Sequence, residues 1–211
     1  MGDPAPQRTA RPRGAWLLAS ASPRRSELLA REGQDFEVEP SGVDERVTAE
    51  PPATFAARIA REKAAEVSRR KPGRWVLAAD TIVTIDGDIL GKPRDGVDAA
   101  HMLRRLSGRR HLVITGFVVV RPSGEIFREA MVETEVAFRE LTEAEIAAYV
   151  ASGEPSDKAG AYAIQGGAGA FVRELRGSHS NVVGLPLEEV RRALIDAGIW
   201  QSGTSALGGE R

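Results

Sequence analysis

The chain has 211 residues, of which 42% are hydrophobic and 28% charged, a composition typical of one globular domain with a substantial core. Lysine and arginine total 29 against 30 aspartate and glutamate, so the net charge of −1 excludes a general attraction to nucleic acid or to an anionic membrane, and any anion binding must be local. No cysteine is present, which excludes disulfides, thiolate zinc sites and cysteine nucleophiles and fits a reducing compartment.

The two ends of the chain differ from its middle. The first residues carry three arginines, but the apolar run that follows them is broken at Ser20 before the core of a signal peptide can form. We therefore interpret residues 1–14 as a disordered extension, residues 15–200 as the domain and residues 201–211 as a flexible tail. The longest apolar runs fall far short of the roughly 20 residues that a membrane span requires, so no membrane association is expected.

The first half of the domain predicts three strands and two helices. Apolar runs and alternation indicate the strands, at residues 15–19, 34–39 and 75–85. Helical spacing of apolar residues indicates the helices, at residues 25–31 and 54–69. Asp86-Gly87 is a tight-turn signal, so the third strand should enter a hairpin.

The second half predicts a helix, two long strands and two further helices, at residues 95–108, 111–121, 125–139, 142–151 and 187–197. Asp95 and Thr142 are the expected caps of the first two helices, and Glu145 stands at the capping-box position. The turn composition Pro122-Ser123-Gly124 predicts that the two strands pair as an antiparallel hairpin. Together the elements predict a single α/β domain with a long mixed sheet.

The loop from Ser20 to Arg25 is the first candidate site. It brings two hydroxyls, a proline and the adjacent guanidiniums of Arg24 and Arg25 to a helix start. Helix N-termini and arginine forks both suit phosphate oxygens. On this segment alone, a serine-proline helix cap with solvent-exposed arginines is an equally good interpretation.

Two carboxylates are candidates for binding a metal ion. Asp80 interrupts an apolar strand, and a buried carboxylate needs a partner. Mg²⁺ takes one or two carboxylates together with phosphate oxygens of the substrate, so a metal ion is one such partner. A hydrogen bond to a turn is the alternative for Asp80, and Glu45, in a loop, is uninformative by itself.

Lysine is rare among the basic residues of this chain. Only four lysines occur among 29 lysines and arginines, and Lys92 lies in a glycine-proline turn while Lys63 lies on a predicted helix. This choice indicates a need for a compact point charge, although surface lysines placed by chance fit as well. Gln165 precedes a glycine run in which the backbone can approach a ligand closely.

Other common site patterns are absent from the sequence. No GxGxxG opens a helix and no GxxxxGK[ST] occurs, which disfavours Rossmann and P-loop interpretations. The three histidines are far apart and match no zinc spacing, so we interpret them as structural.

Six ordered segments carry a family resemblance: LASASPRR at 18–25, REKA at 61–64, ADT at 79–81, GKP at 91–93, DKAGAY at 157–162 and VVGLP at 182–186. Together they strongly resemble the Maf family of nucleoside triphosphate pyrophosphatases, first known as septum-formation inhibitors. The resemblance runs from about Trp16 to Ala197, with no departure at the motif positions.

The resemblance implies a fold and a reaction. The fold would be that of the inosine triphosphate pyrophosphatase superfamily, a long twisted mixed sheet flanked by helices in two lobes with a central cleft, usually dimeric. The reaction hydrolyses a nucleoside triphosphate between the α and β phosphates with a divalent metal ion, Mg²⁺ or Mn²⁺. Such an enzyme would have a house-cleaning role in the nucleotide pools of the cytoplasm, with a possible link to the arrest of cell division.

The resemblance also implies residue roles. The triphosphate would be held by Ser20, Arg25, Lys63 and Lys92. The metal ion would be held by Glu45 and Asp80, and Asp80 would accept a proton from water. A free aspartate has a pKa near 4, so a metal ion that acidifies the water accounts for the reaction as well as a base does, and the sequence leaves this choice open.

Substrate choice in the family follows three positions, here Arg24, Thr81 and Gln165. They match the dTTP and UTP subgroup, which implies dTTP, UTP and modified pyrimidine nucleotides such as 5-methyl-UTP or pseudo-UTP as substrates, whereas the 7-methyl-GTP subgroup has Trp, Gln and Glu there. The glutamine offers a donor and an acceptor, as a uracil or thymine edge requires. The alternatives are a 7-methyl-GTP pyrophosphatase and a nucleotide-responsive septum-formation inhibitor without significant turnover.

Overall fold

A computed structural model describes residues 16–47 and 49–201 of the chain. Its centre is a seven-stranded mixed sheet. Six strands follow the order β2-β1-β3-β5-β6-β7, and the seventh, β4, pairs with β3. The strands are β1 Trp16–Leu18, β2 Glu37–Val38, β3 Trp75–Ile85, β4 Asp88–Leu90, β5 Arg110–Val120, β6 Ile126–Phe138 and β7 Val172–Arg176. The predicted α/β fold with a mixed sheet is confirmed.

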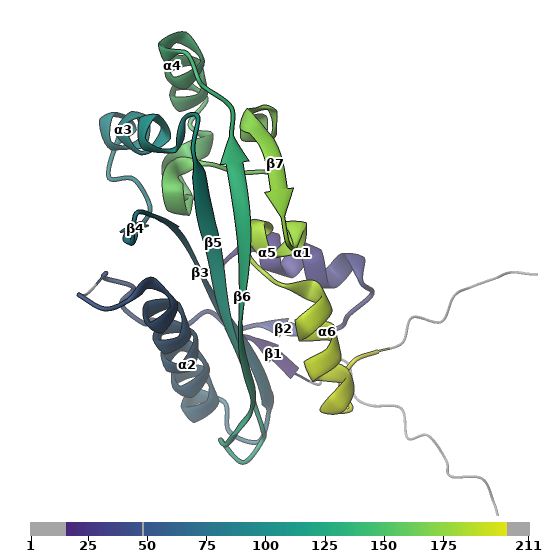
Figure 1. Ribbon diagram of the computed structural model, residues 1–211. Helices are drawn as coiled ribbons and strands as arrows, with labels where there is room; N and C mark the ends of the chain where they lie inside the picture. The colour runs from purple at the N-terminus through teal and green to yellow at the C-terminus, as the bar shows by residue number, and fades with distance from the viewer. Residues whose placement is uncertain (1–15, 48, 202–211) are drawn as a thin grey trace, which may run out of the picture.

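Helices cover both faces of this sheet (Figure 1). The α-helices are α1 Pro23–Arg31, α2 Pro52–Arg70, α3 Gly96–Leu106, α4 Glu143–Ala151, α5 His179–Val183 and α6 Leu187–Asp196. Three short 3₁₀ helices are η1 Glu154–Asp157, η2 Ala159–Ala161 and η3 Gly167–Phe171. Helix α2 lies on one face, α1, α5 and α6 lie on the other, and α3 and α4 cover the far end of the long hairpin β5–β6 (Figure 1). No helix in the described part of the chain is long and apolar enough to cross a membrane.

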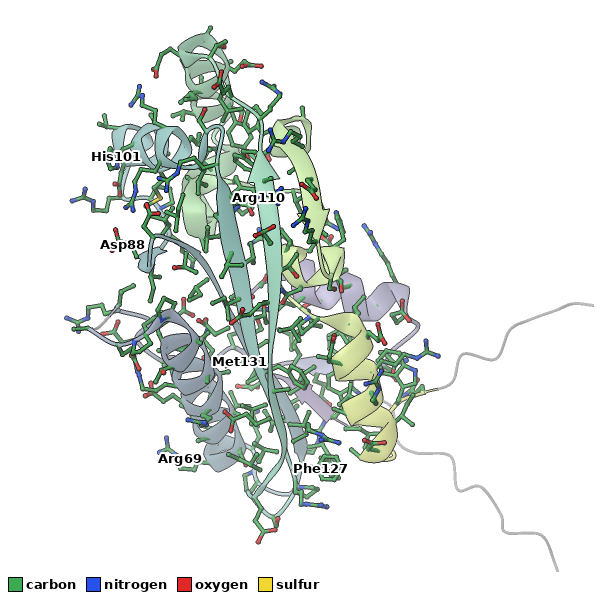
Figure 2. All side chains as sticks on the ribbon, viewed as in Figure 1. Arg69, Asp88, His101, Arg110, Phe127 and Met131 are labelled. Atoms are coloured by element: carbon green, nitrogen blue, oxygen red, sulfur yellow. The ribbon has the colours of Figure 1, made fainter. Side chains whose placement is uncertain are left out.

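The hydrophobic core divides into two lobes along the β5–β6 hairpin. In one lobe, Leu103 of α3, Phe138 of β6 and Ile146 of α4 belong to a single buried cluster. In the other lobe, the two faces of the sheet pack against α2 and against α1 and α6. Figure 2 shows Arg110 and Phe127 toward opposite ends of the hairpin, one in each lobe.

Local signals explain several element boundaries. The Asp95 side chain accepts from the Asp98 N–H at 2.8 Å, and Thr142 and Glu145 form the predicted capping box. The turn after β5 is closed by the Arg121 N–H, which donates to the Glu125 carbonyl at 2.8 Å, so the predicted antiparallel hairpin is confirmed.

The open stretch of β3 positions the cavity described below. Along one edge, β3 pairs with β1 at residues 75–77 and with β4 at residues 83–85. Within the described residues, the intervening stretch 78–82 has no strand partner on this edge, while its other edge pairs with β5. The sheet therefore has a gap between the end of β1 and the start of β4.

Several expectations differ from the structure. The strand expected at 34–39 is reduced to Glu37–Val38, because β1 is only three residues long and offers no further pairing. The glycine run after Gln165, for which no helix or strand was predicted, contains η3 and leads into β7.

The ends of the domain are described only in part. The expected extension, residues 1–14, and residues 202–211 of the expected tail lie outside the described residues. The first tail residue, Gln201, is held: its N–H donates to Gln34 Oε1 at 3.0 Å, and Gln34 Nε2 donates to its carbonyl at 2.9 Å. Gln201 therefore packs with the domain, one residue past the predicted domain end.

Candidate active site

A cavity of about 240 Å³ opens at the gap in the sheet, between the two lobes. Its apolar lining comes from both core clusters, with Val83, Val113 and Tyr162 from one and Val183 from the other. All nine predicted site residues line it: Ser20, Arg24, Arg25, Glu45, Lys63, Asp80, Thr81, Lys92 and Gln165. Residues spread over 146 positions of the sequence, from 20 to 165, thus meet at one place.

The alternation of β3 explains how two neighbouring residues serve opposite sides of the cavity. Consecutive side chains of a strand point to opposite faces. Asp80 therefore faces α2, where Lys63 is its partner, and Thr81 faces α1, where Arg25 is its partner. Because this stretch of β3 has no neighbour on its open edge, both side chains reach the same cavity.

One wall of the cavity, which we call the α2 wall, consists of Glu45, Lys63, Asp80 and Lys92. The Lys63 ammonium lies between two carboxylates, 2.7 Å from Asp80 Oδ1 and 2.6 Å from Glu45 Oε1. Glu45 also lies 3.7 Å from Lys92 Nζ. Lys63 and Asp80 are 5% and 6% exposed, so this ion pair is fixed within the protein.

The Arg25 cluster, made of Ser20, Arg25, Thr81 and Gly184, closes the back of the cavity. The guanidinium donates to the Gly184 carbonyl at 2.7 Å, to the Ser20 hydroxyl at 3.0 Å and to the Thr81 hydroxyl at 2.9 Å. Thr81 is held in turn by Thr115, with 2.9 Å between their hydroxyl oxygens. Three of the five N–H groups of Arg25 are used in this way, so its orientation is set before any ligand arrives.

The opposite wall, which we call the η1 wall, consists of Arg24, Asp157, Lys158 and Gln165. Arg24 Nη1 lies 3.7 Å from Asp157 Oδ2, and Asp157 also accepts a hydrogen bond from Lys158. Gln165 is exposed at the cavity rim, and within residues 16–47 and 49–201 its side-chain amide makes no hydrogen bond. This wall is looser than the α2 wall.

The charges around the cavity make a local anion site in a chain that is nearly neutral. Five cationic side chains and three acidic ones line it, a surplus of two positive charges. Burial alone would raise the pKa of Glu45, but the charges of Lys63, Lys92 and Arg25 outweigh it and hold that pKa below its ordinary value. Burial lowers the pKa of Arg25, against the opposing charges of Asp80 and Glu45.

The structure decides three of the alternatives left open by the sequence. The side chain of Ser22, at the N-cap of α1, makes no capping hydrogen bond, and Arg25 is 8% exposed, so the helix-cap interpretation with solvent-exposed arginines is wrong for Arg25. Asp80 pairs with Lys63 on α2 rather than with a turn. Lys63 is buried and is therefore not a surface lysine placed by chance.

Four further residues hold or line the site without having been predicted: Gly184, Asp157 and Lys158 line the cavity, and Thr115 lies behind it. Thr115 and Gly184 hold the Arg25 cluster, and Asp157 and Lys158 form part of the η1 wall. The signal for Gly184 was its place in the VVGLP segment, and its φ of +129° is one that favours glycine. With Lys158, three of the four lysines of the chain line the cavity, so the rarity of lysine was the available signal there as well.

Comparisons with known proteins place the chain among nucleotide pyrophosphatase relatives of one family. The family model described as Maf-like protein matches residues 15–197. The dTTP/UTP pyrophosphatase of Anaeromyxobacter dehalogenans (strain 2CP-C) is 57% identical over 185 residues, covering 86% of this chain and 93% of the relative. The dTTP/UTP pyrophosphatase of Geobacter metallireducens is 52% identical over 175 residues, covering 82% and 91%. A solved nucleoside-triphosphatase, or dITP/XTP pyrophosphatase, of Mycobacterium abscessus is 19% identical, with a TM-score of 0.39 over 58% of this chain and 71% of its own.

Proposed function

This chain belongs to the Maf family, and from that premise we propose that it is a nucleoside triphosphate pyrophosphatase that hydrolyses dTTP and UTP to the monophosphate and pyrophosphate. The observation that carries the proposal is the meeting of nine family-matched residues around one positively charged cavity. Relatives that carry the name dTTP/UTP pyrophosphatase and align over most of both chains support the same activity.

The phosphate groups bind to Ser20, Arg25, Lys63 and Lys92 in this proposal. A triphosphate needs its charge neutralised, and the surplus of positive charge is available for that purpose. Arg25 is oriented in advance by its three hydrogen bonds, so little reorganisation is needed when the phosphate arrives. Lys92 is the most exposed of these residues, with 62% of its side chain open to solvent.

Glu45 and Asp80 are the proposed ligands of Mg²⁺ or Mn²⁺. Both carboxylates lie within 2.7 Å of Lys63 Nζ and line the same cavity, so they are close enough together to share one ion beside the lysine. Such an ion takes one or two carboxylates together with phosphate oxygens and waters. The described residues hold no group of three or more His, Asp or Glu side chains arranged for a metal ion. When bound, the ion supplies neutralisation of phosphate charge and lowers the pKa of its water.

Asp80 is the proposed proton acceptor for the attacking water. Its Oδ1 accepts a hydrogen bond from Lys63, whereas no described residue donates to Oδ2, which leaves that oxygen for a proton or a metal ion. Lys63 thus holds the carboxylate in place while it acts. As the water gives its proton to Asp80, its oxygen attacks the α phosphorus. The bond from the α phosphorus to the bridging oxygen of the β phosphate breaks, and pyrophosphate leaves.

Base choice is the proposed task of Arg24, Thr81 and Gln165. Gln165 lies at the open rim, where an amide can pair with both the acceptor and the donor of a uracil or thymine edge. Thr81 is tied to Arg25 and to Thr115, so we propose that it acts on substrate choice through the position of the Arg25 cluster.

We further propose that the enzyme works as a homodimer in the cytoplasm, with a house-cleaning role in nucleotide pools, as the family resemblance implies. Sedimentation of the purified chain tests the dimer. A monomer over the working concentration range would contradict it.

A substrate panel tests the function. Pyrophosphate release should be measured with dTTP, UTP, CTP and 7-methyl-GTP in the presence of Mg²⁺, Mn²⁺ or a chelator. We expect dTTP and UTP to turn over many times with metal ion alone and to stop with the chelator. A preference for 7-methyl-GTP would contradict the base assignment, and tight binding without turnover would support the septum-formation inhibitor instead.

A further inference from the structure

The loop that carries Gln165, residues 163–167, is anchored on both sides of that residue. The N–H of its first residue donates to the Tyr149 hydroxyl oxygen at 3.0 Å. The N–H of its last residue donates to Glu154 Oε2 at 3.1 Å. The backbone on either side of Gln165 is therefore fixed by two side chains from outside the loop.

These two side chains are bonded to each other. The Tyr149 hydroxyl donates to Glu154 Oε1 at 2.7 Å, and the Tyr149 ring packs edge-on against Phe171 at 5.2 Å between centroids. Burial and the hydrogen bond to Glu154 raise the pKa of Tyr149, so the hydroxyl keeps its proton. The Tyr149 hydroxyl therefore donates its hydrogen to Glu154 and accepts, through a lone pair, the N–H of the loop.

The close approach of Glu154 to the loop depends on a glycine. A Cβ at Gly166 would lie 2.1 Å from Glu154 Oε1, well inside contact distance. A larger residue at Gly166 would therefore push the carboxylate away from the loop N–H that it accepts from.

Helix η1, to which Glu154 belongs, also contacts Arg24 on the other side of the η1 wall. Glu154 is the first residue of η1 and Asp157 the last, and Asp157 Oδ2 lies 3.7 Å from Arg24 Nη1. The Glu154 carbonyl accepts from Lys158 Nζ at 3.3 Å, which ties the cavity lysine to the same turn. One short helix thus contacts the segments that carry both Arg24 and Gln165.

We propose that Tyr149 and Glu154 are positioning residues for base discrimination, which hold the loop so that the Gln165 amide meets the pyrimidine edge in one orientation. The inference rests on the proposed function, because it takes Gln165 as the residue that reads the base. The side chain of Gln165 is exposed and has no partner among the described residues, so the loop backbone is the only part that these contacts can fix.

The test compares UTP with CTP, whose base edges present opposite donors and acceptors at the 4-position. Tyr149→Phe keeps the packed ring and removes both hydroxyl contacts. We expect the ratio of kcat/KM for UTP to that for CTP to fall by about fivefold, toward the ratio of Gln165→Ala, since a hydrogen bond contributes on the order of 1 kcal/mol. The kcat for UTP at saturation should change less than KM.

Two further variants act on the same contact without touching Tyr149. Glu154→Gln keeps the size of the side chain but replaces one acceptor oxygen, and Gly166→Ala adds the obstructing carbon while leaving every hydrogen-bonding group in place. Both should lower the same ratio. Ser156→Ala, on the same turn of η1, removes only a hydroxyl that donates to the Gly153 carbonyl at 2.8 Å and should keep the wild-type ratio.

The outcomes separate this inference from the function on which it rests. If the wild type releases no pyrophosphate from UTP or dTTP, the proposed function is wrong. If Gln165→Ala lowers the ratio while Tyr149→Phe, Glu154→Gln and Gly166→Ala, all folded by thermal melting, keep it, the function stands and the positioning role is refuted. An unchanged ratio in Gln165→Ala also refutes the positioning role.

Discussion

The α2 wall holds its central charges on regular secondary structure, whereas the η1 wall holds its polar groups on short turns. Lys63 and Asp80 lie on a 19-residue helix and an 11-residue strand and are almost fully buried. Asp157, with 67% of its side chain exposed, and the exposed Gln165 lie on a 3₁₀ turn and a loop. The charges proposed to act on the phosphates are thus held by a long helix and the sheet, whereas the groups proposed to choose the base lie on turns and loops, where sequence can change without disturbing that framework.

The largest expected effect is a loss of activity when Asp80, at the centre of the α2 wall, is replaced. Asp80→Asn should lower kcat by about a thousandfold, within the range that general acid-base catalysis contributes, because an amide neither accepts the proton nor binds a metal ion well. Thermal melting should remain near the wild-type value. Near-normal pyrophosphate release by this variant would remove Asp80 from the mechanism.

Lys63→Met tests the buried pair through stability. It leaves Asp80 without its cation, and we expect the free energy of unfolding to fall by about 3 kcal/mol in urea titrations. The double variant with Asp80→Asn should recover part of this loss. Lys71→Met removes a half-exposed lysine that lies 3.3 Å from Glu39 and should change stability by less than about 1 kcal/mol.

The next expected effect is a pH dependence of stability that arises from His111, which contacts the cavity residue Tyr162. His111 is 3% exposed, and burial lowers its pKa from 6.5 to about 4, while its Nε2 lies 2.9 Å from the Tyr162 hydroxyl. Because the folded pKa is below the unfolded one, the unfolded state binds the proton first as pH falls. The contribution of His111 to stability is therefore complete above pH 6.5 and is lost as pH falls toward 4.

From pH 7 to pH 4.5 this loss amounts to about 2–3 kcal/mol. His111→Gln should show a correspondingly smaller fall in unfolding free energy over that interval, measured by urea titration at both pH values. Equal falls in both proteins would show that His111 is not the group that titrates.

The smallest expected effect is a loss of kcat/KM when Thr115, which supports the Arg25 cluster, is replaced. Thr115 is fully buried, and Thr115→Val replaces the hydroxyl that supports Thr81 with a methyl group of similar size. We expect kcat/KM for UTP to fall by about fivefold, the equivalent of roughly 1 kcal/mol. An unchanged kcat/KM would mean that Thr81 holds Arg25 without this support.

The sequence predicted those parts of the fold whose signals are local. The capping box at Thr142 and Glu145 and the run of β3 depend on neighbouring residues, and they occur where expected. The elements that were missed, η1 to η3, β7 and α5, are each five residues or shorter, and such lengths leave too few repeats for a periodic pattern.

The predicted site residues meet in one cavity, but their partners were harder to foresee. Arg25 donates to the carbonyl of Gly184, which lies 159 positions away, and a backbone carbonyl leaves no mark of its role in the residue type. Likewise, nothing local to Glu154 indicates that its carboxylate supports the loop around Gln165. Contacts of this kind follow from the folded chain and not from any short segment.

The gap in β3 also bears on association between molecules. Because backbone groups alternate between the two edges of a strand and the Leu77 carbonyl accepts from Ala19, the N–H and C=O groups of Ala79 and Thr81 point into the gap. A free sheet edge ordinarily invites a strand of another chain. Here the stretch is closed off by β1 at one end and β4 at the other, so a docking strand meets both. At this gap the protein gains a cavity lined by backbone without presenting a long free strand edge to other chains.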